Sequence, residues 1–300
     1  MTMKLHQLRA FVAVAEQGSI HGAARALYLT QPAVTKSIRE LETEVGVVLL
    51  ARNTRGIVVT EQGLLLLERA RLIVNELQRA EAQMAYVRDG QKGKLAIGVT
   101  PLAGMTLLPA AFAAFRAQQP EVAVTFYEHP SAQLVENLRS GALDFAVAAI
   151  MDEPEPSFVR SQVLAEFPTV FAVRNGGSLA KAKSLSELRD AEWMHFDTTL
   201  QHADFVRMLF TQQGIEPPTR ITLCTSQSLF YGIASTLDVV VSWSTHALMA
   251  GLAQQFTALD FIEAPHTLRL HLMQRENAIL TRPAERFVQN ILETARSLGR

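Results

Sequence analysis

Two adjacent helical segments near the N-terminus constrain the fold of this chain more than any other feature. Residues 19–44 read SIHGAARALYLTQPAVTKSIRELETE. The first segment has an apolar face at helical spacing, and its small alanines allow a second helix to approach closely. These residues are Ile20, Ala23, Ala24 and Leu27. Two short helices joined at an angle by a turn have the geometry that places a helix in the major groove of DNA.

The second segment has the signals of a helix start. Thr30 can cap it by accepting a backbone N–H, as Ser19 can for the first segment. Pro32 lies in the first turn, where a missing N–H costs nothing. On one side of this helix, apolar residues recur at helical spacing and should face the core. They are Val34, Ile38, Leu41 and Val45.

The other side of the second helix carries polar and basic residues. Gln and Arg can form paired hydrogen bonds with base edges, whereas Thr and Lys suit phosphates. Together with Ser19, the candidate DNA-contacting residues here are Gln31, Pro32, Thr35, Lys36 and Arg39. For a lone amphipathic helix, a solvated face would be the better interpretation. The short helix before it and the hairpin after it favour DNA contact.

Residues 47–60, VVLLARNTRGIVVT, predict a β-hairpin, because two β-branched runs flank a turn-rich tip at residues 53–56. Arg52 and Arg55 would then lie over the sugar–phosphate backbone or the minor groove. Residues 1–60 hold seven Lys/Arg against four Glu, a net charge of +3, although the whole chain carries −1. We therefore expect a winged helix-turn-helix DNA-binding domain over residues 1–60.

A long helix without proline is expected over residues 61–89. Its apolar residues are spaced alternately by four and three positions, which is an a/d heptad seam. The seam consists of Leu66, Ala70, Ile73, Leu77, Ala80, Met84 and Val87. On a lone helix this stripe would be exposed to water, so we expect a second copy of the chain to cover it and form a homodimer. The alternative is that the stripe packs on the chain's own C-terminal domain.

These landmarks resemble the N-terminal domain of LysR-type transcriptional regulators. They are A-A-x-x-L at residues 23–27, Q-P-A-V at 31–34 and I-x-x-L-E at 38–42. Leu50 departs from the family pattern, which usually has Phe there, but it exchanges one apolar anchor for another. The resemblance implies a regulator that binds double-stranded promoter DNA as a homodimer or a tetramer and contacts RNA polymerase. It also implies a small-molecule effector.

Residues 90–300 alternate between strand and helix patterns. Strands are expected at 94–99, 122–128, 144–149, 167–173, 192–196, 219–224 and 238–242, and helices at 103–118, 131–140 and 282–297. Such alternation predicts a parallel sheet with helices on both faces. The two sets form subdomain I, at about 90–162 and 268–300, and subdomain II, at about 163–267. This α/β layout resembles the effector-binding domain of the same family, which has the architecture of type 2 periplasmic binding proteins.

Polar residues follow the ends of several expected strands. Ligands of open α/β sheets bind there, where helix N-termini present free N–H groups. The candidate effector-binding residues are Thr100, Pro101, Leu102, His129, Ser131, Phe171, Thr198, Thr199, Gln201, Ser226, Gln227 and Trp243. Hydroxyls and helix dipoles suit a carboxylate or a sulfonate, and Phe171 or Trp243 can hold an apolar or aromatic body. The alternative for each Ser or Thr is a helix N-cap.

Enzymes and metal proteins find little support in the sequence. It has no Gly-x-Ser-x-Gly element, Walker loop, dinucleotide fingerprint or Cys/His metal-binding spacing, so we expect neither an enzyme nor a cofactor. His195 and His202 fit the end of a strand and the start of a helix better than a metal site. Cys224 is the only cysteine, so no intrachain disulfide can form. A small buried apolar role suits it better than a redox switch.

The N-terminus has no continuous apolar segment of the secretory-signal type, and no window reaches the roughly 18 apolar residues that span a bilayer. We therefore expect a cytoplasmic protein with no membrane partner. The competing hypothesis is a small-molecule-binding α/β protein or an enzyme whose N-terminal domain only mediates assembly.

Overall fold

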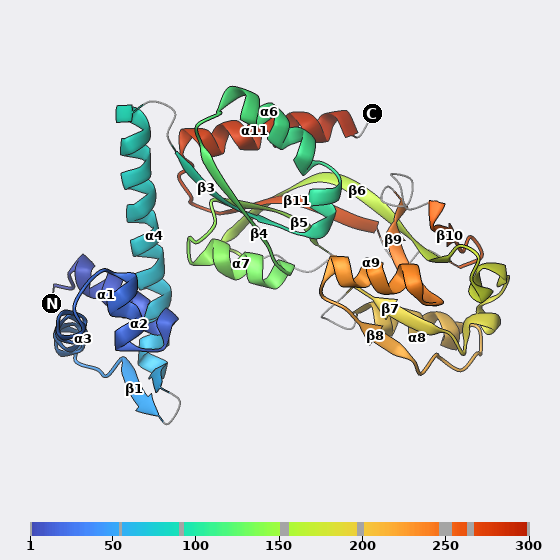
Figure 1. The fold of residues 1–300 in the computed structure, drawn as a ribbon, viewed down its shortest axis with the longest axis horizontal. Coiled ribbons are helices and arrows are strands. Elements are labelled where there is room, and N and C mark those ends of the chain that lie inside the picture. The colour runs from blue at the N-terminus through green and yellow to red at the C-terminus, as the bar shows by residue number, and fades with distance from the viewer. Residues whose placement is uncertain are drawn as a thin grey trace.

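The computed structural model shows a small helical domain, one long helix and a two-lobed α/β domain (Figure 1). It describes residues 2–53, 56–89, 93–150, 156–196, 201–245, 254–262 and 267–298. Within these ranges, no helix combines the length and the apolar composition needed to cross a bilayer.

The N-terminal domain is a winged helix-turn-helix. Its elements are α1 (Leu5–Gln17), α2 (Ile20–Ala26), α3 (Gln31–Val45), β1 (Leu50–Asn53) and β2 (Gly56–Val59). Ser19 Oγ accepts the Gly22 N–H at 3.0 Å, which confirms this residue as the N-cap of α2. Thr30 Oγ1 accepts the Ala33 N–H at 3.4 Å and caps α3 in the same way. The two N-caps therefore set where α2 and α3 begin.

The three helices enclose a small apolar core. Val34, Ile38 and Leu41, which the helical spacing places on the inner side of α3, are buried in it. Phe11 and Val14 of α1 are fully buried against them. The core therefore fixes which face of α3 remains for solvent or DNA.

The long helix α4 (Glu61–Asp89) runs for 29 residues, about 44 Å at 1.5 Å per residue. Leu67, Ala70 and Val74 on its first half complete the core of the N-terminal domain. Ala70 is 0% exposed, so its assignment to the dimer seam is wrong, because a residue enclosed by its own domain has no surface for a second chain. Leu66 is half-buried against the same core.

The Glu42 side chain attaches the wing to α3. Glu42 Oε1 accepts the backbone N–H of Leu49 at 2.8 Å and that of Leu50 at 3.2 Å. Thr60, just after the wing, donates its hydroxyl to the Val48 carbonyl oxygen at 2.7 Å. β1 pairs antiparallel with β2, so these contacts place the whole hairpin beside α3.

The C-terminal domain contains a sheet with strand order β4-β3-β5-β11-β6-β9-β7-β8, and β10 pairs with β6. The strands are β3 (Lys94–Val99), β4 (Ala123–Glu128), β5 (Phe145–Ile150), β6 (Val159–Arg174), β7 (Glu192–His195), β8 (Ile221–Leu223), β9 (Val239–Ser244), β10 (Phe256–Ala258) and β11 (Thr267–Arg275). The helices are α5 (Pro101–Met105), α6 (Leu108–Gln118), α7 (Ser131–Arg139), α8 (Gln201–Gln212), α9 (Gln227–Thr236) and α11 (Arg282–Leu298). Two short 3-10 helices lie at Ser178–Lys181 and Leu185–Leu188.

Two long strands, β6 and β11, connect the subdomains. They pair antiparallel with each other, while β3, β4 and β5 are parallel on one side and β7, β8 and β9 on the other. The sheet is therefore mixed and not wholly parallel as the alternation predicts, because both crossover strands run antiparallel to their outer neighbours. The helix expected at 103–118 is interrupted between Met105 and Leu108, since Pro109 in the first turn of α6 cannot donate a hydrogen bond.

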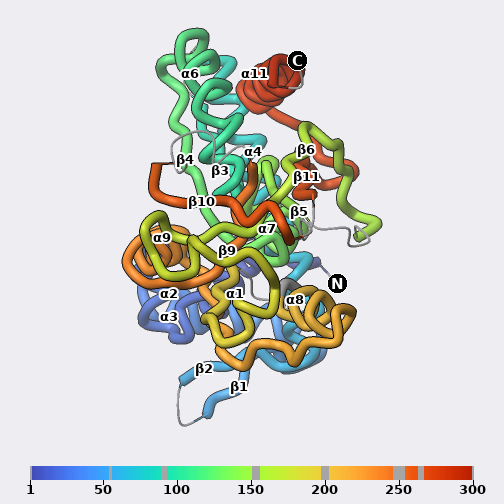
Figure 2. Tube along the Cα trace, turned by 90° about the vertical axis from the view of Figure 1, so that its right-hand side faces the viewer, coloured from blue at the N-terminus to red at the C-terminus, as the bar shows by residue number. Residues whose placement is uncertain are grey.

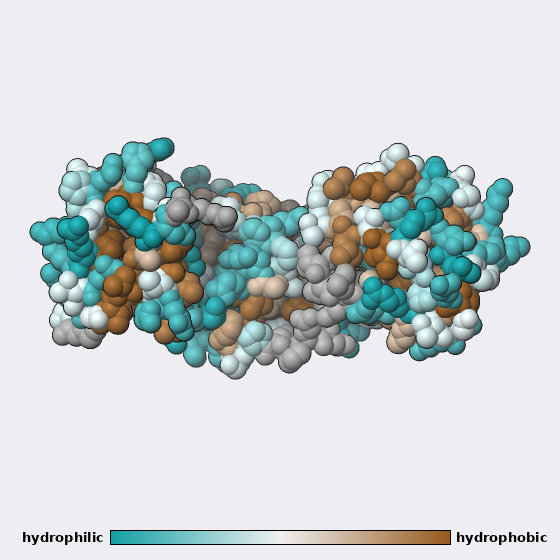
Figure 3. All heavy atoms as spheres, turned by 90° about the horizontal axis from the view of Figure 1, so that it is seen from below, coloured by the Kyte–Doolittle hydropathy of each residue, from teal (hydrophilic) through white to brown (hydrophobic). Residues whose placement is uncertain are grey.

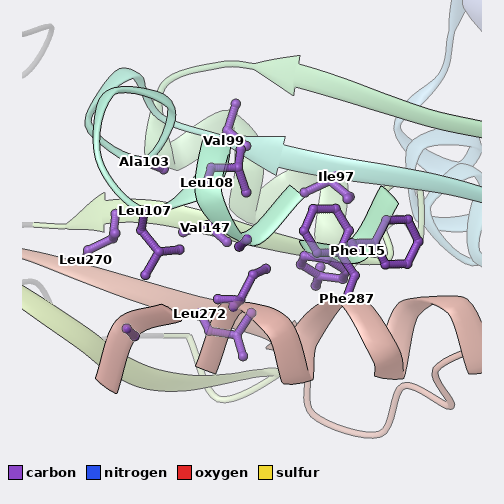
Figure 4. Packing of buried hydrophobic residues seen from close by; sticks show 14 of the residues in the cluster. Ile97, Val99, Ala103, Leu107, Leu108, Phe115, Val147, Leu270, Leu272 and Phe287 are labelled. Atoms are coloured by element: carbon purple, nitrogen blue, oxygen red, sulfur yellow. The ribbon is translucent and has the colours of Figure 1, made fainter. Parts of the chain in front are cut away.

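Subdomain I is closed on one face by α6 and α11, which lie side by side (Figure 1). Phe115 of α6 stacks on Phe287 of α11 with ring centroids 4.6 Å apart. Ile97 and Val147 pack beneath them from the sheet (Figure 4). Leu134 of α7 belongs to a separate apolar cluster, and α7 lies on the opposite face of the sheet (Figure 1). Figure 2 shows α6 and α11 at one end of the molecule and the wing at the other.

In subdomain II, Asp238 fixes the segment that follows β6. Its Oδ2 accepts the Ser178 N–H at 2.9 Å, and Arg174 Nη2 donates to its Oδ1 at 2.6 Å. The hydrogen bond from the Ser178 backbone is the largest contribution that holds the pKa of Asp238 below its ordinary value, although burial opposes it. The ionised carboxylate therefore connects the end of β6 to the start of β9.

Gly63→Ala should destabilise the N-terminal domain. A Cβ at this position would lie 2.2 Å from the Leu49 carbonyl oxygen and 2.7 Å from Val59 Cγ1. Overpacking of this kind costs about 1–3 kcal/mol. Gly104→Ala is the matched control, because nothing lies within 4 Å of its added Cβ. Chemical denaturation measures the free energy of unfolding of both variants, and equal stabilities would contradict the close approach of α4 to the wing.

Glu42→Ala should loosen the wing, because the Leu49 and Leu50 N–H groups lose their charged acceptor. Hydrogen bonds to charged groups contribute about 1.5–3 kcal/mol, so we expect a loss of that order in the free energy of unfolding. Glu40→Ala is the control, since it removes only a surface ion pair with Lys36 at 3.8 Å, worth less than about 1 kcal/mol. Urea titration followed by circular dichroism compares the two, and an equal effect would contradict this role of Glu42.

Candidate functional site

The outer face of α3 presents the side chains expected to contact DNA. Gln31, Pro32, Lys36 and Arg39 are exposed, and Thr35 is half-buried. All five line one open groove of about 1000 Å³. The groove is completed by Lys4, Glu40, Thr43 and Glu44. The structure thus brings the predicted residues of α3 together on a single surface.

Contacts within this surface orient some of the side chains. Gln31 Nε2 lies 3.1 Å from His21 Nδ1, which links the start of α3 to α2. Lys36 Nζ lies 3.8 Å from Glu40 Oε1, one turn along the helix. Among the described residues, the Arg39 guanidinium has no hydrogen-bond or ion-pair partner, so it can bind a base edge without breaking a contact. The sequence reasoning missed His21 and Lys4, because only the packing angle between helices brings them to α3.

The remaining expected DNA contacts do not line this groove. Ser19 Oγ already accepts the Gly22 N–H, which leaves its O–H proton available to a phosphate. Arg52 is exposed on β1, close to the tip of the wing. Arg55 lies outside the described residues.

The turn between α2 and α3 holds Tyr28 in an unusual conformation. Tyr28 has φ 56°, and 96% of it is exposed. The left-handed region costs a residue with a Cβ roughly 1–2 kcal/mol, and strain of this kind is common at functional sites. No pattern in the sequence singled out Tyr28, so this exposed aromatic side chain beside α3 is an addition to the candidate surface.

The expected dimer seam on α4 divides into two parts. Leu66 and Ala70 face the core of their own N-terminal domain. Further along, Ile73, Met84 and Val87 are 47%, 61% and 64% exposed. Ala80 is exposed as well, and Leu77 is half-buried. Packing of this second part on the chain's own C-terminal domain, the alternative considered above, is wrong for the exposed residues, which remain an uncovered apolar stripe.

Apolar side chains are also exposed where α4 begins. Val47 and Val48 before the wing are 42% and 61% exposed, and Leu64 and Leu65 of α4 are 57% and 73% exposed. Figure 3 shows apolar side chains gathered on the N-terminal domain and again over subdomain II. Exposed apolar patches of this kind mark interaction surfaces.

In subdomain I, candidate effector-binding residues follow β3 and β4, whose ends meet because the two strands are parallel neighbours. Thr100 Oγ1 accepts the Ala149 N–H at 2.8 Å, so this hydroxyl oxygen joins the end of β3 to β5. His129 is half-buried and stacks on Tyr127 with ring centroids 6.4 Å apart. Ser131, the first residue of α7, is half-buried, and its side chain has no hydrogen-bond partner among the described residues.

Two candidate residues of subdomain II lie at the start of α9. Ser226 Oγ accepts the Leu229 N–H at 3.4 Å, so this serine is an N-cap, which was the alternative for each hydroxyl. Gln227 Nε2 lies 3.9 Å from Sδ of Met105, the last residue of α5. Pro101 begins this short helix. The structure therefore brings α5 of one subdomain next to the start of α9 of the other.

Two candidate residues belong to cores and do not present their side chains to a ligand. Leu102 is 9% exposed in the core of subdomain I. Phe171 is 1% exposed and packs edge-on against Trp193, with ring centroids 5.1 Å apart. Both predictions are wrong because a position near a strand end does not determine which way the side chain points. Trp243 is 5% exposed, and its Nε1 is buried without a hydrogen-bond partner among the described residues.

Other candidates cannot be placed. Thr198 and Thr199 lie outside the described residues, as do the side chains of Gln201 and His202. His195 ends β7 as expected and is buried. Within the described part of the chain, no three His, Cys, Asp or Glu side chains gather closely enough to hold a metal ion. Cys224 is buried, as expected for a small apolar residue.

Comparison with known proteins gives two family matches and several solved relatives. The chain is 27% identical over 258 residues to the HTH-type transcriptional regulator GbpR of Azospirillum brasilense, which covers 85% of this chain and 74% of GbpR. It is 36% identical over 190 residues to the regulator CbbR of Sinorhizobium medicae (strain WSM419), which covers 63% of this chain and 59% of CbbR.

Among solved structures, CbnR, a LysR family transcriptional regulator, aligns over 98% of this chain and 99% of its own, with a TM-score of 0.68 and 23% identity. Full-length CbnR in complex with its target DNA aligns over 98% of this chain and 100% of its own, with a TM-score of 0.52 and 25% identity.

The family matches follow the two halves of the fold. Residues 5–64 match the model described as a bacterial regulatory helix-turn-helix protein of the lysR family. Residues 88–296 match the LysR substrate binding domain. The first match covers the winged domain and the second the α/β domain, so the chain belongs to the family of LysR-type transcriptional regulators.

Proposed function

We propose that this chain regulates transcription by binding double-stranded promoter DNA through α3 and the wing. The observation that carries the proposal is the outer face of α3, where Gln31, Lys36 and Arg39 are exposed around one groove. The second helix of a helix-turn-helix enters the major groove with its N-terminal residues at the base edges. The likeness to CbnR, whose structure with target DNA is known, supports this docking.

Each side chain on this face has a role in the proposed complex. Gln31 and Arg39 form hydrogen bonds with base edges, because their paired donors and acceptors fit them. Lys36 and Thr35 contact phosphates, and Arg52 on the wing neutralises the neighbouring backbone. The net charge of +3 over residues 1–60 is modest, so the affinity depends on the wing and on a second copy as much as on α3.

The second copy is the reason we propose a homodimer. Ile73, Met84 and Val87 form an apolar stripe that the described part of the chain leaves exposed. Pairing through this stripe brings two DNA-reading domains together on half-sites one helical turn or a multiple apart, roughly 34–36 Å per turn. The proposal also includes a tetramer formed by two dimers and a contact with RNA polymerase. It places the protein in the bacterial cytoplasm.

We further propose that a small anion, a carboxylate or a sulfonate, binds between the two subdomains. Support comes from the contact of Gln227 with Met105, which brings the two lobes together beside several hydroxyls. Ser131 offers a hydroxyl that no other described group occupies, and Trp243 contributes a buried N–H donor. A ligand that prefers one arrangement of the lobes shifts the population towards it, and this couples the ligand to DNA binding.

The competing function is a small-molecule-binding protein or an enzyme whose N-terminal domain serves only in assembly. The family membership and the exposed face of α3 disfavour it. It predicts no DNA binding that depends on salt, so the titration below distinguishes the two.

Gln31→Ala and Arg39→Ala should each weaken binding to DNA from upstream of the chain's own gene by about 1–3 kcal/mol, because each removes a base-edge contact. Lys36→Ala should reduce the salt dependence of binding by about one phosphate contact. Fluorescence anisotropy over a range of salt concentrations measures both effects. Arg286→Ala, an exposed arginine of α11, is the control. Unchanged affinity in both Gln31 and Arg39 variants, with the protein folded, would contradict this reading face.

Small carboxylates and sulfonates, such as benzoate and benzenesulfonate, should raise the melting temperature of the full chain when they fit the site. For any compound that does so, Ser131→Ala and Gln227→Ala should reduce the shift, because each removes a hydrogen-bonding group from the proposed site. Gln213→Ala, an exposed glutamine beyond α8, is the control. Thermal-shift and calorimetric titrations measure the effect, and a shift retained in both variants would place the ligand elsewhere.

A further inference from the structure

A buried pair of charges joins α4 to the effector-binding domain of its own chain. Arg79 of α4 donates from Nε to Asp144 Oδ1 at 2.9 Å, and from Nη2 to the Leu143 carbonyl oxygen. Only 16% of the Arg79 side chain and 9% of the Asp144 side chain are exposed. Ion pairs at a protein surface are usually more exposed to water and contribute little to stability. This pair is shielded from water, and it connects residues 65 positions apart in the chain.

The acceptor side of this contact is rigid. Asp144 Oδ2 accepts the Ala96 N–H at 2.8 Å, and the Asp144 N–H donates to the Ala96 carbonyl oxygen at 2.8 Å. The carboxylate is therefore fixed to β3 at the point where β5 begins. Arg79 meets an acceptor that cannot follow it if α4 moves.

Close packing surrounds the ion pair. Gly141, in the turn between α7 and β5, has φ 73°, and a Cβ there would lie 3.2 Å from Leu72 Cδ1 and 3.5 Å from Arg79 Nη1. Asn75 Nδ2 donates to the Ser140 carbonyl oxygen of the same turn at 2.9 Å. The side chains of the helix therefore pack in close contact with this turn.

A second ion pair joins α4 to subdomain I nearer the start of the helix. Glu68 Oε1 is 3.0 Å from Arg139 Nη1 at the end of α7. Contacts between α4 and subdomain I therefore extend from Glu68 to Arg79, which is about three turns of helix. A contact of this length resists bending of the helix away from the domain as well as sliding along it.

Glu76 links the same cluster to a strand that crosses between the subdomains. Its Oε1 accepts from Arg79 Nη1 at 2.7 Å and also from Arg275 Nη2. Arg275, whose side chain is 19% exposed, is the last residue of β11. Because β11 pairs with β6 along the connection between the lobes, one carboxylate contacts both the crossover and α4.

We propose that Arg79 is a positioning residue that, with Glu76, Asp144 and Arg275, holds α4 in this arrangement on its own effector-binding domain. This set of four side chains is called the charge lock below. α4 completes the core of the DNA-binding domain, so the lock sets the direction in which the DNA-reading helix leaves the effector-binding domain. Removal of one partner of a buried pair leaves an uncompensated charge, which favours release of the helix into water.

The charge lock acts within one chain, so its test needs neither DNA nor an effector. In a Cys224→Ser background, Gln17→Cys and Glu285→Cys carry spin labels on the N-terminal domain and on subdomain I; both positions are exposed. Labelled full-length chains are co-assembled with an excess of unlabelled chains, so that the measured distances lie within one chain. Pulsed electron–electron double resonance then measures the distribution of distances between the two spin labels.

With the lock intact, we expect a narrow peak at the distance that belongs to this arrangement. Arg79→Ala should lose this narrow peak, and so should Asp144→Asn, which keeps an oxygen acceptor for the Ala96 N–H but removes the charge. Arg69→Ala, at an exposed arginine of the same helix, is the matched control and should keep the peak. Circular dichroism melts establish that each variant is folded.

A distribution as narrow in Arg79→Ala and Asp144→Asn as in Arg69→Ala would overturn the proposal, because the helix would then be held without the lock. Should Arg79→Ala not fold, Glu76→Gln takes its place, since it removes the negative charge between two arginines and leaves both of them on the chain. Arg79→Lys separates charge from geometry. Lysine keeps the charge but cannot bind Glu76, Asp144 and Leu143 at once, so partial broadening is expected and a full return to the narrow peak would contradict a role for the guanidinium fork.

Discussion

α4 has two different partners and one exposed apolar surface, and each lies on a different side of one stiff helix. Leu67 and Val74 complete the core of the DNA-binding domain, whereas Arg79 pairs with Asp144 of subdomain I. Met84 and Val87 keep an apolar surface exposed. The three surfaces cannot be adjusted independently, because rotation of the helix about its axis improves one at the expense of the others. The orientation of the DNA-reading surface relative to the effector-binding domain therefore depends on the position and rotation of α4.

The DNA-binding end could be predicted from the sequence because its determinants are local. Thr30 caps α3 through a hydrogen bond three residues away, and the spacing of Val34 and Ile38 fixes the buried face. The heptad seam was less informative. Its spacing identifies an apolar stripe but not what covers it, and at Ala70 the cover is the chain's own core. A seam that changes partner midway along a helix has no signature in the spacing.

In the effector-binding domain the strands could be located from composition, but the direction of their side chains could not. Phe171 lies in a largely apolar strand, and its side chain points into a core. Contacts such as Gln31 with His21 and Arg79 with Asp144 depend on packing angles between elements 10 and 65 residues apart. The mixed sheet likewise depends on contacts between segments distant in sequence, because β6 and β11 pair antiparallel with the parallel sets on either side of them.

The contribution of α4 to the N-terminal core determines where this protein can be divided. A fragment that ends with the wing would leave the core of the N-terminal domain incomplete, since Leu67 and Val74 of that core belong to α4. The smallest self-contained DNA-reading unit thus includes the first half of α4. A chimera that exchanges this unit between two regulators has to be joined inside the helix, after Val74, and it carries the donor's first helical turns into the recipient's linker.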